Sequence, residues 1–342
     1  MSVAPLNEFI QLNISDAVLL GAPLSLGSAM DAALQRRVME LDRASDRFRL
    51  IPAHDSLVLL KASCGSPKLM HTLRTSPCAG HDTLSHTDAA AALRLCLTNI
   101  ANVNITDAQW LQASLPVRAG GLGIRSVKSV ALPAFLASSS GTKLLQDRLL
   151  SRCFLDIPDH HLDHNLAVWC TEHQPTPPPS GVLATKQRSW DKPEIEKLHS
   201  SLLASQPDDH GRARLLAASA AHSGDWLHAL PISSCGLRLN DEAVRVAVGL
   251  RLGANLCEQH CCPCGTVVDC RGTHGLSCKR GSARMARHSY VNDIVHRALV
   301  RAKIASVKEP VPVLLVCRAQ TGSALMDLLW FPGRQAGMQS GP

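Results

Sequence analysis

The sequence predicts a mainly α protein in which a helical region, a Pro-rich linker and a small α+β domain around clustered cysteines follow one another. Apolar residues recur at helical spacing through most of the chain. The run 174–181 holds four prolines, which favour extended polyproline geometry over a helix. Six of the 13 cysteines fall between Cys257 and Cys278, so a compact metal-binding unit is expected there.

The individual helices are expected from apolar spacing and from capping residues. In the first of them, Met30, Leu34, Val38 and Leu41 share one face. We expect helices over residues 28–48, 57–62, 68–74, 82–99, 108–113, 126–138, 193–204 and 209–222, and one that Asn240 caps. The Gly-rich run 115–124 has no strand before it, so it is interpreted as a loop between helices and not as a dinucleotide-binding fingerprint.

The length of 342 residues permits two domains with a linker. We expect a helical region over 1–150, a Pro-rich linker region over 151–194, a helical region with the cysteine cluster over 195–305, and a disordered tail over 306–342. After Pro310 the chain contains one acid, Asp327, and it ends in Gly333, Gly337 and Gly341 among polar residues, which is an unlikely composition for a core element.

The balance of charge favours an acidic partner. The formal net charge is +7, which suits nucleic acid, whereas aromatic residues make up only 3% of the chain and provide no obvious platform for stacking bases. No run of about 18 apolar residues occurs, so no membrane span is expected. Scattered cysteines without a secretory signal favour a reducing compartment, nuclear or cytoplasmic. No protein partner is indicated.

The cysteine cluster predicts a structural zinc site. Three thiolates and an imidazole can hold a soft divalent ion in tetrahedral array. The preferred set is Cys262, Cys264, His274 and Cys278, in which Pro263 and Gly265 suit a tight knuckle and His274 lies four residues from Cys278. Three alternatives stay open: Cys261 replaces Cys262, Cys257 or His260 contributes a ligand, or the cysteines are buried free thiols. A disulfide framework is disfavoured by the odd number of cysteines.

A basic segment follows the cluster and predicts contact with DNA or RNA. Between 271 and 303 the sequence places one acid, Asp293, among eight basic residues: Arg271, Lys279, Arg280, Arg284, Arg287, Arg297, Arg301 and Lys303. Apolar residues from Val291 to Leu299 recur at helical spacing, so the segment is expected to be an amphipathic helix. His288 and Asn292, four residues apart, share one face of it, beside Arg287. These three, with Arg280 and Arg284, are the candidate nucleic-acid contacts.

The combination of motifs in this part of the chain resembles the restriction-like endonuclease module of non-LTR retrotransposons. The motifs are Cys-x-Cys-Gly at 262–265, His-Gly-Leu-Ser-Cys at 274–278 and Arg-His-x-x-x-Asn-Asp at 287–293. The resemblance implies that the first two form a zinc-binding knuckle and that Arg287, His288 and Asn292 form a second motif. In that family a Pro-Asp nuclease core with further carboxylates follows and binds a catalytic metal ion. No Pro-Asp pair follows Pro310 in this chain.

The first 150 residues are similar to the part of the same elements' reverse transcriptase that follows the palm. The similar runs are 19–24, 67–74 and 109–124, and the resemblance implies thumb-like helices. The polymerase box of that family is an aromatic residue, any residue and two aspartates, and this chain does not contain it; its Asp-Asp pair, Asp208–Asp209, has no aromatic residue two positions earlier.

The resemblance implies a fragment of an RNA-directed DNA polymerase and endonuclease polyprotein that keeps zinc and nucleic-acid binding and has no catalytic residues of its own. Codons permitted for 319–341, read two nucleotides later, can spell the missing Pro-Asp motif, so the tail from about 311 is expected to be out of frame. Two alternatives stay open. In the first, a partner supplies carboxylates to an active nuclease or polymerase. In the second, the chain is a zinc-stabilised interaction module without a nucleic-acid role.

Overall fold

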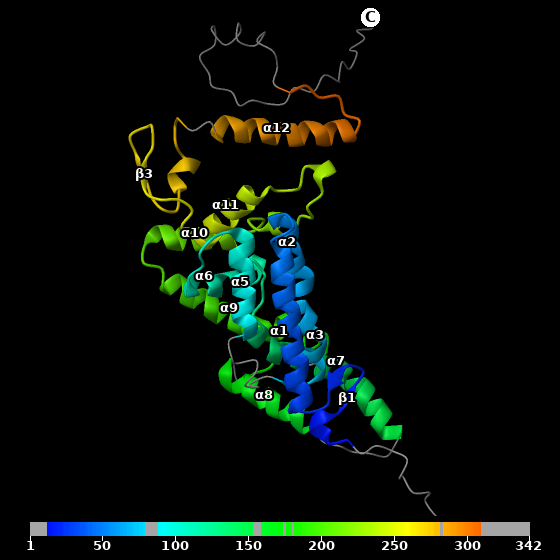
Figure 1. Ribbon diagram of the computed structural model, residues 1–342. Helices are drawn as coiled ribbons and strands as arrows, with labels where there is room; N and C mark the ends of the chain where they lie inside the picture. Colours follow the sequence, from blue (N-terminus) through cyan, green and yellow to red (C-terminus); the bar gives the residue numbers. More distant parts are fainter. Residues whose placement is uncertain are drawn as a thin grey trace, which may run out of the picture. The chain divides into compact units, whose positions relative to one another are not determined.

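The computed structural model describes residues 12–78, 88–152, 159–173, 176–179, 181–280 and 283–308. Helices predominate among them, which confirms the mainly α class (Figure 1). The chain divides into two compact units, Met1–Glu258 and Gln259–Pro342, which are described separately below. Within the described residues no helix is both long and apolar enough to cross a membrane.

The first unit is built from helices and one short hairpin. Its strands are β1 (Val18–Leu19) and β2 (Ala22–Pro23), paired antiparallel. Its helices are α1 (Ser28–Phe48), α2 (Ala53–Leu59), α3 (Met70–Thr75), α5 (Asp88–Ala101), α6 (Asp107–Ser114), α7 (Val127–Arg152), α8 (His160–Glu172), α9 (Gln187–Ala204), α10 (Asp209–Ser219) and α11 (Asp241–Leu252). A turn of π-helix, Leu60–Cys64, continues α2.

The main core of the first unit lies where α1 and α5 run side by side (Figure 1). Met30, Leu60 and Leu97 are fully buried there, as the apolar spacing of their helices requires. Leu122, from the Gly-rich run, is also fully buried in this core. The run between α6 and α7 is therefore a loop, as expected, and it is packed into the unit instead of lying loose on its surface.

The Pro-rich region differs from the expected linker. Helix α8 and the start of α9 fall inside 151–194, and the first compact unit continues past this region to Glu258 instead of ending at about 150. The indole N–H of Trp169 donates to the carbonyl of Trp190 at 3.0 Å, and the two rings meet edge to face at 5.1 Å. Asp191 forms a bidentate ion pair with Arg125, with both contacts at 2.8 Å. These contacts fix the two flanks of the prolines to the body of the unit.

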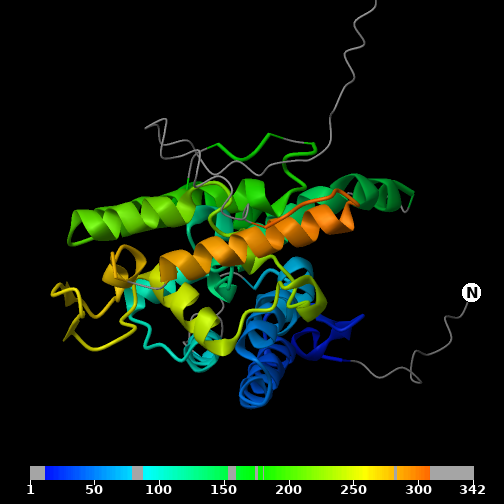
Figure 2. The ribbon, with the colours of Figure 1, turned by 90° about the horizontal axis from the view of Figure 1, so that it is seen from above.

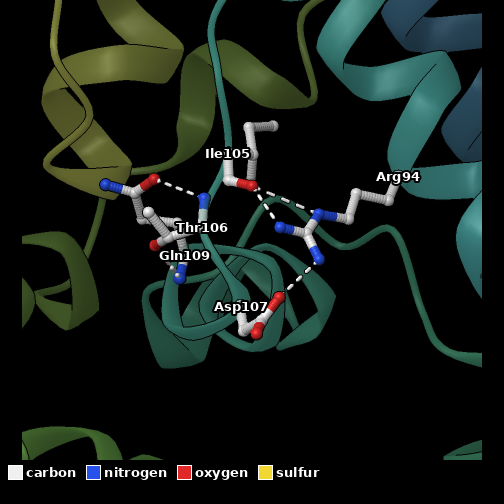
Figure 3. A network of polar contacts seen from close by, with 5 residues as sticks. All are labelled: Arg94, Ile105, Thr106, Asp107 and Gln109. Carbon is white, nitrogen blue, oxygen red and sulfur yellow. Dashed lines mark hydrogen bonds and ion pairs between the residues drawn. The ribbon is translucent and has the colours of Figure 1, made fainter.

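The start of α6 is held by a capping box, which Figure 3 shows with its neighbours. The Thr106 hydroxyl accepts from the N–H of Gln109 at 3.4 Å, and the Gln109 side chain accepts from the N–H of Thr106 at 2.9 Å. Arg94 of α5 donates to the Ile105 carbonyl and to Asp107 at 2.6 Å. The cap and the arginine together fix the angle at which α6 leaves α5.

Replacing Thr106 by alanine is expected to lower the free energy of unfolding of the first unit by about 1 kcal/mol, because the helix loses a capping oxygen. Urea denaturation followed by circular dichroism measures this change. Thr171→Ala is the matched control, since the Thr171 hydroxyl only bonds back to Ala167 within α8; the control should stay within about 0.5 kcal/mol of the unmodified chain. Equal effects of the two substitutions would contradict the role of the cap.

The second unit joins a small hairpin to helices, as expected for an α+β domain. Strands β3 (His260–Cys261) and β4 (Val267–Val268) pair antiparallel. The 3-10 helix Thr273–Leu276 follows, and then the long helix α12 (Ala283–Arg301), drawn in orange in Figure 2.

Beyond α12 the chain reverses direction. Lys303 has a φ of +58°, in the left-handed region that ends many helices. Ser306 then lies 2.8 Å from His296, and Lys308 pairs with Asp293 of α12. The chain after α12 thus runs back along the helix. The tail expected to be disordered and out of frame falls almost entirely in 309–342, outside the described residues.

Candidate metal centre

The four preferred ligands come together in the second unit. The donor atoms of Cys262, Cys264, His274 and Cys278 all lie within 4.8 Å of one another. The sulfurs of Cys262 and Cys278 are 3.6 Å apart, and the Cys264 sulfur is 3.2 Å from His274 Nε2. Cys261 is exposed on β3 and is not part of this group. The spacing of the cysteines left open whether Cys261 or Cys262 is a ligand, and the structure selects Cys262.

The first two ligands lie on a knuckle at the end of the β3–β4 hairpin. The N–H of Cys262 donates to the Thr266 carbonyl at 2.9 Å, and the N–H of Gly265 donates to the Cys262 carbonyl at 2.8 Å. Gly265 has a φ of +88°, and a Cβ built there would meet nothing within 4 Å. Glycine is thus needed at this position for its backbone conformation and not for space. The tight turn brings both thiols to the same side of the hairpin.

The other two ligands lie on a second turn. Asp269 accepts from the N–H of Thr273 at 3.3 Å and from its hydroxyl at 3.4 Å, and so fixes the start of the 3-10 helix. The N–H groups of Ser277 and Cys278 donate to the His274 carbonyl at 3.0 Å and 2.9 Å. This turn presents the imidazole of His274 and the thiol of Cys278 to the knuckle.

The surroundings of the thiols favour a thiolate at Cys264. Hydrogen bonds from the side chain and then the backbone of Thr266 lower the pKa of Cys264 to about 6. At Cys262 the backbone N–H of Cys264 lowers the pKa, but hydrogen bonding with the Cys264 side chain, burial and Cys278 together raise it above its ordinary value. The lowered pKa of Cys264 favours its thiolate, which is the form that binds a metal ion.

Two of the separations between donor atoms lie near those of a tetrahedral centre. Zinc–sulfur bonds of about 2.3 Å and zinc–nitrogen bonds of about 2.0 Å imply ligand separations of roughly 3.5–3.8 Å around a tetrahedron. The Cys262–Cys278 separation of 3.6 Å falls in that range, and the Cys264–His274 separation of 3.2 Å is slightly shorter. Cys278 is 5% exposed, so one side of the centre is closed to solvent. The Cys3His cluster can therefore hold a metal ion.

Only some of the predicted nucleic-acid contacts can be placed. Arg280 donates to the carbonyl of Pro263 at 2.7 Å, so its guanidinium lies against the knuckle. His288 and Asn292 meet on α12, where the Asn292 amide lies 3.1 Å from His288 Nε2. Arg284 and Arg287 belong to α12, but their side chains lie outside the described part of the chain.

Three contributors to the centre were not expected from the sequence. Thr266 lowers the pKa of Cys264, Asp269 orders the second turn, and Arg280 braces the knuckle. An aspartate four residues before Thr273 is a local signal that could have identified this turn. The contact between Arg280 and Pro263 spans 17 positions and leaves no such local signal.

Comparisons of the chain with protein-family models, with curated proteins and with solved structures found no match. The assignment of the metal ligands therefore rests on the distances between the four side chains in this chain.

Proposed function

We propose that the chain is a retrotransposon-derived fragment whose second unit binds one structural zinc ion and uses it to present a basic segment to nucleic acid. The observation that carries the proposal is the convergence of three sulfurs and one imidazole within 4.8 Å. Soft thiolate and imidazole ligands suit zinc, and four protein ligands leave no open position for a reacting water. The ion would therefore hold the fold and take no part in a reaction.

The distribution of charge supports the nucleic-acid part of the proposal. Residues 259–308 contain nine Lys or Arg and two Asp, a net charge of +7, which equals the formal charge of the whole chain. The remaining residues are therefore neutral in sum. Such a concentration of positive charge beside a zinc knuckle suits a phosphate backbone.

The same proposal assigns no catalytic residue to the chain. The sequence has neither an aromatic-x-Asp-Asp box nor a Pro-Asp pair after Pro310, and a nuclease centre needs carboxylates to hold its metal ion. A reducing compartment, nuclear or cytoplasmic, belongs to the proposal, because oxidation of the cysteines to disulfides would remove the zinc ligands.

Binding of the full chain to a labelled single-stranded RNA and to a DNA duplex, measured by fluorescence anisotropy across a salt series, tests the proposal. Affinity for at least one of them is expected to fall steeply with salt. Arg284→Gln combined with Arg287→Gln should reduce the salt slope on duplex DNA by about two, because each phosphate contact contributes roughly 0.9.

The matched control removes two exposed charges from the first unit, Arg36→Gln with Arg43→Gln on α1, and should leave the slope unchanged. A flat affinity across the salt series, with zinc still bound, would instead identify a zinc-stabilised interaction module without a nucleic-acid role. An equal loss in the two double variants would show that net charge alone governs binding.

A further inference from the structure

A second group of charged side chains lines a groove in the first unit, apart from the cysteine cluster. The groove lies between α9, the 3-10 turn Val117–Ala119 and the end of α10, and its volume is about 370 Å³. Its polar lining residues, which define the Arg118 groove, are Arg118, Lys192, Glu196, His199, Ser200 and Ser219.

One pair in the Arg118 groove resembles a nucleophile and its base, but its hydrogen bonds do not allow that role. His199 Nε2 lies 2.9 Å from the Ser219 hydroxyl oxygen. The hydroxyl donates its single hydrogen to the Leu215 carbonyl at 2.9 Å, so His199 must be the donor to Ser219. A histidine that donates to a serine cannot remove its proton. The hydroxyl is also packed against Gly120, where an added Cβ would lie 2.6 Å from it.

The charged side chains of the Arg118 groove favour the binding of an anion. Arg118 is exposed, and its side chain has no hydrogen-bond or ion-pair partner within the described residues. Lys192 pairs with Glu196 at 3.7 Å, but their side chains are 68% and 64% exposed, so the pair is weak and Lys192 can turn to another anion. The groove thus offers two cations and a hydroxyl, opposed by a single carboxylate.

We propose that the Arg118 groove binds a phosphate group. The planar guanidinium of Arg118 can donate two parallel hydrogen bonds to phosphate oxygens, and Lys192 adds a point charge from α9. Ser200 supplies a further donor on the same helix face. The phosphate comes either from a small phosphomonoester or from a nucleic-acid backbone, which share this chemistry. The groove uses neither the cysteine cluster nor α12, so it is independent of the zinc-dependent function proposed above.

Calorimetric titration of the full chain with inorganic phosphate and with a nucleoside monophosphate tests the proposal, and anisotropy with a short single-stranded oligonucleotide distinguishes the two sources. Arg118→Gln is expected to weaken binding about tenfold, since it removes charge-assisted hydrogen bonds. Lys192→Gln should also weaken it. Lys197→Gln, five residues further along α9 and outside the groove, is the matched control and should change affinity less than about twofold.

Glu196→Gln distinguishes a phosphate site from loss of structure, because removal of the opposing carboxylate should strengthen phosphate binding. Circular dichroism confirms that each variant is folded. Binding of the small phosphates with this pattern supports a phosphomonoester site, and binding of the oligonucleotide alone with the same pattern supports a backbone site. No binding of any of the three ligands, or equal losses in Arg118→Gln and Lys197→Gln, would overturn the proposal. Repeating the titration with Cys278→Ser tests whether the groove acts independently of the second unit. Loss of the metal ion and of the second unit's structure should leave the affinity of the Arg118 groove for phosphate unchanged.

Discussion

Replacing Cys278 by serine is expected to remove the metal ion and to unfold the second unit. Among the described residues of that unit, the buried apolar side chains are Val268 and Cys278, far too few for an independent core. Structural zinc supplies apparent binding free energies of about 10–16 kcal/mol in small peptides, which is folding free energy for a unit of this kind. Loss of the most buried ligand should therefore cost the unit its structure while the first unit stays folded.

Metal analysis of the purified chain and amide hydrogen exchange measure the two effects. We expect about one zinc per chain in the unmodified protein and a small fraction of that in Cys278→Ser. Exchange protection should be lost in the hairpin and the 3-10 helix. Cys261→Ser is the matched control, because its thiol is exposed on β3 outside the cluster, and it should keep both zinc and protection. Protection that survives both Cys278→Ser and a chelator would contradict a structural role for the ion.

Replacing Arg251 by methionine is expected to destabilise the first unit by about 3–5 kcal/mol, because charged hydrogen bonds are lost and buried carbonyls are left without donors. The Arg251 side chain of α11 is 7% exposed among carbonyl groups. Its guanidinium donates to the carbonyls of Gly121 at 3.0 Å, Val117 at 2.9 Å and Ala218 at 2.9 Å, and also to that of Ser223 at 3.2 Å. One side chain thus joins α11, the Gly-rich loop and the end of α10.

Urea denaturation of the first unit measures the effect of Arg251→Met. Arg212→Gln, an exposed change on α10, is the control and should stay within about 0.5 kcal/mol. Arg251→Lys should be nearly as destabilising as the methionine variant, because a single ammonium cannot reproduce the planar fork. A loss below about 1 kcal/mol in Arg251→Met would show that water or neighbouring groups satisfy the carbonyls instead.

Local patterns were sufficient for several elements. The expected helix over 28–48 coincides with α1 because one apolar face continues without interruption through it. The helix expected over 126–138 instead continues as α7 to Arg152, through serines and a glycine that favour a stop. Helix α8 was assigned to the linker region because its anchor, the contact of Trp169 with Trp190, joins two segments that no local pattern connects.

The ligands of the candidate centre, like helix α1, could be predicted because they depend on residues that are close together in the sequence. The Cys-Pro-Cys-Gly knuckle and the turn from His274 to Cys278 are each local, so spacing alone indicated the ligands. The choice between Cys261 and Cys262 was not local, because it depends on the pairing of Cys261 with Val267 across the hairpin. The Arg251 network and the Arg118 groove unite residues far apart in the sequence, and periodicity carries no information about such contacts.

X-ray absorption at the zinc edge of the purified full chain shows directly whether the Cys3His centre forms. We expect one zinc surrounded by three sulfurs at about 2.3 Å and one nitrogen at about 2.0 Å. In Cys278→Ser this signal should disappear. A zinc bound mainly by oxygen and nitrogen, a shell of four sulfurs, or a chain that binds no zinc under reducing conditions would contradict the proposed centre of Cys262, Cys264, His274 and Cys278.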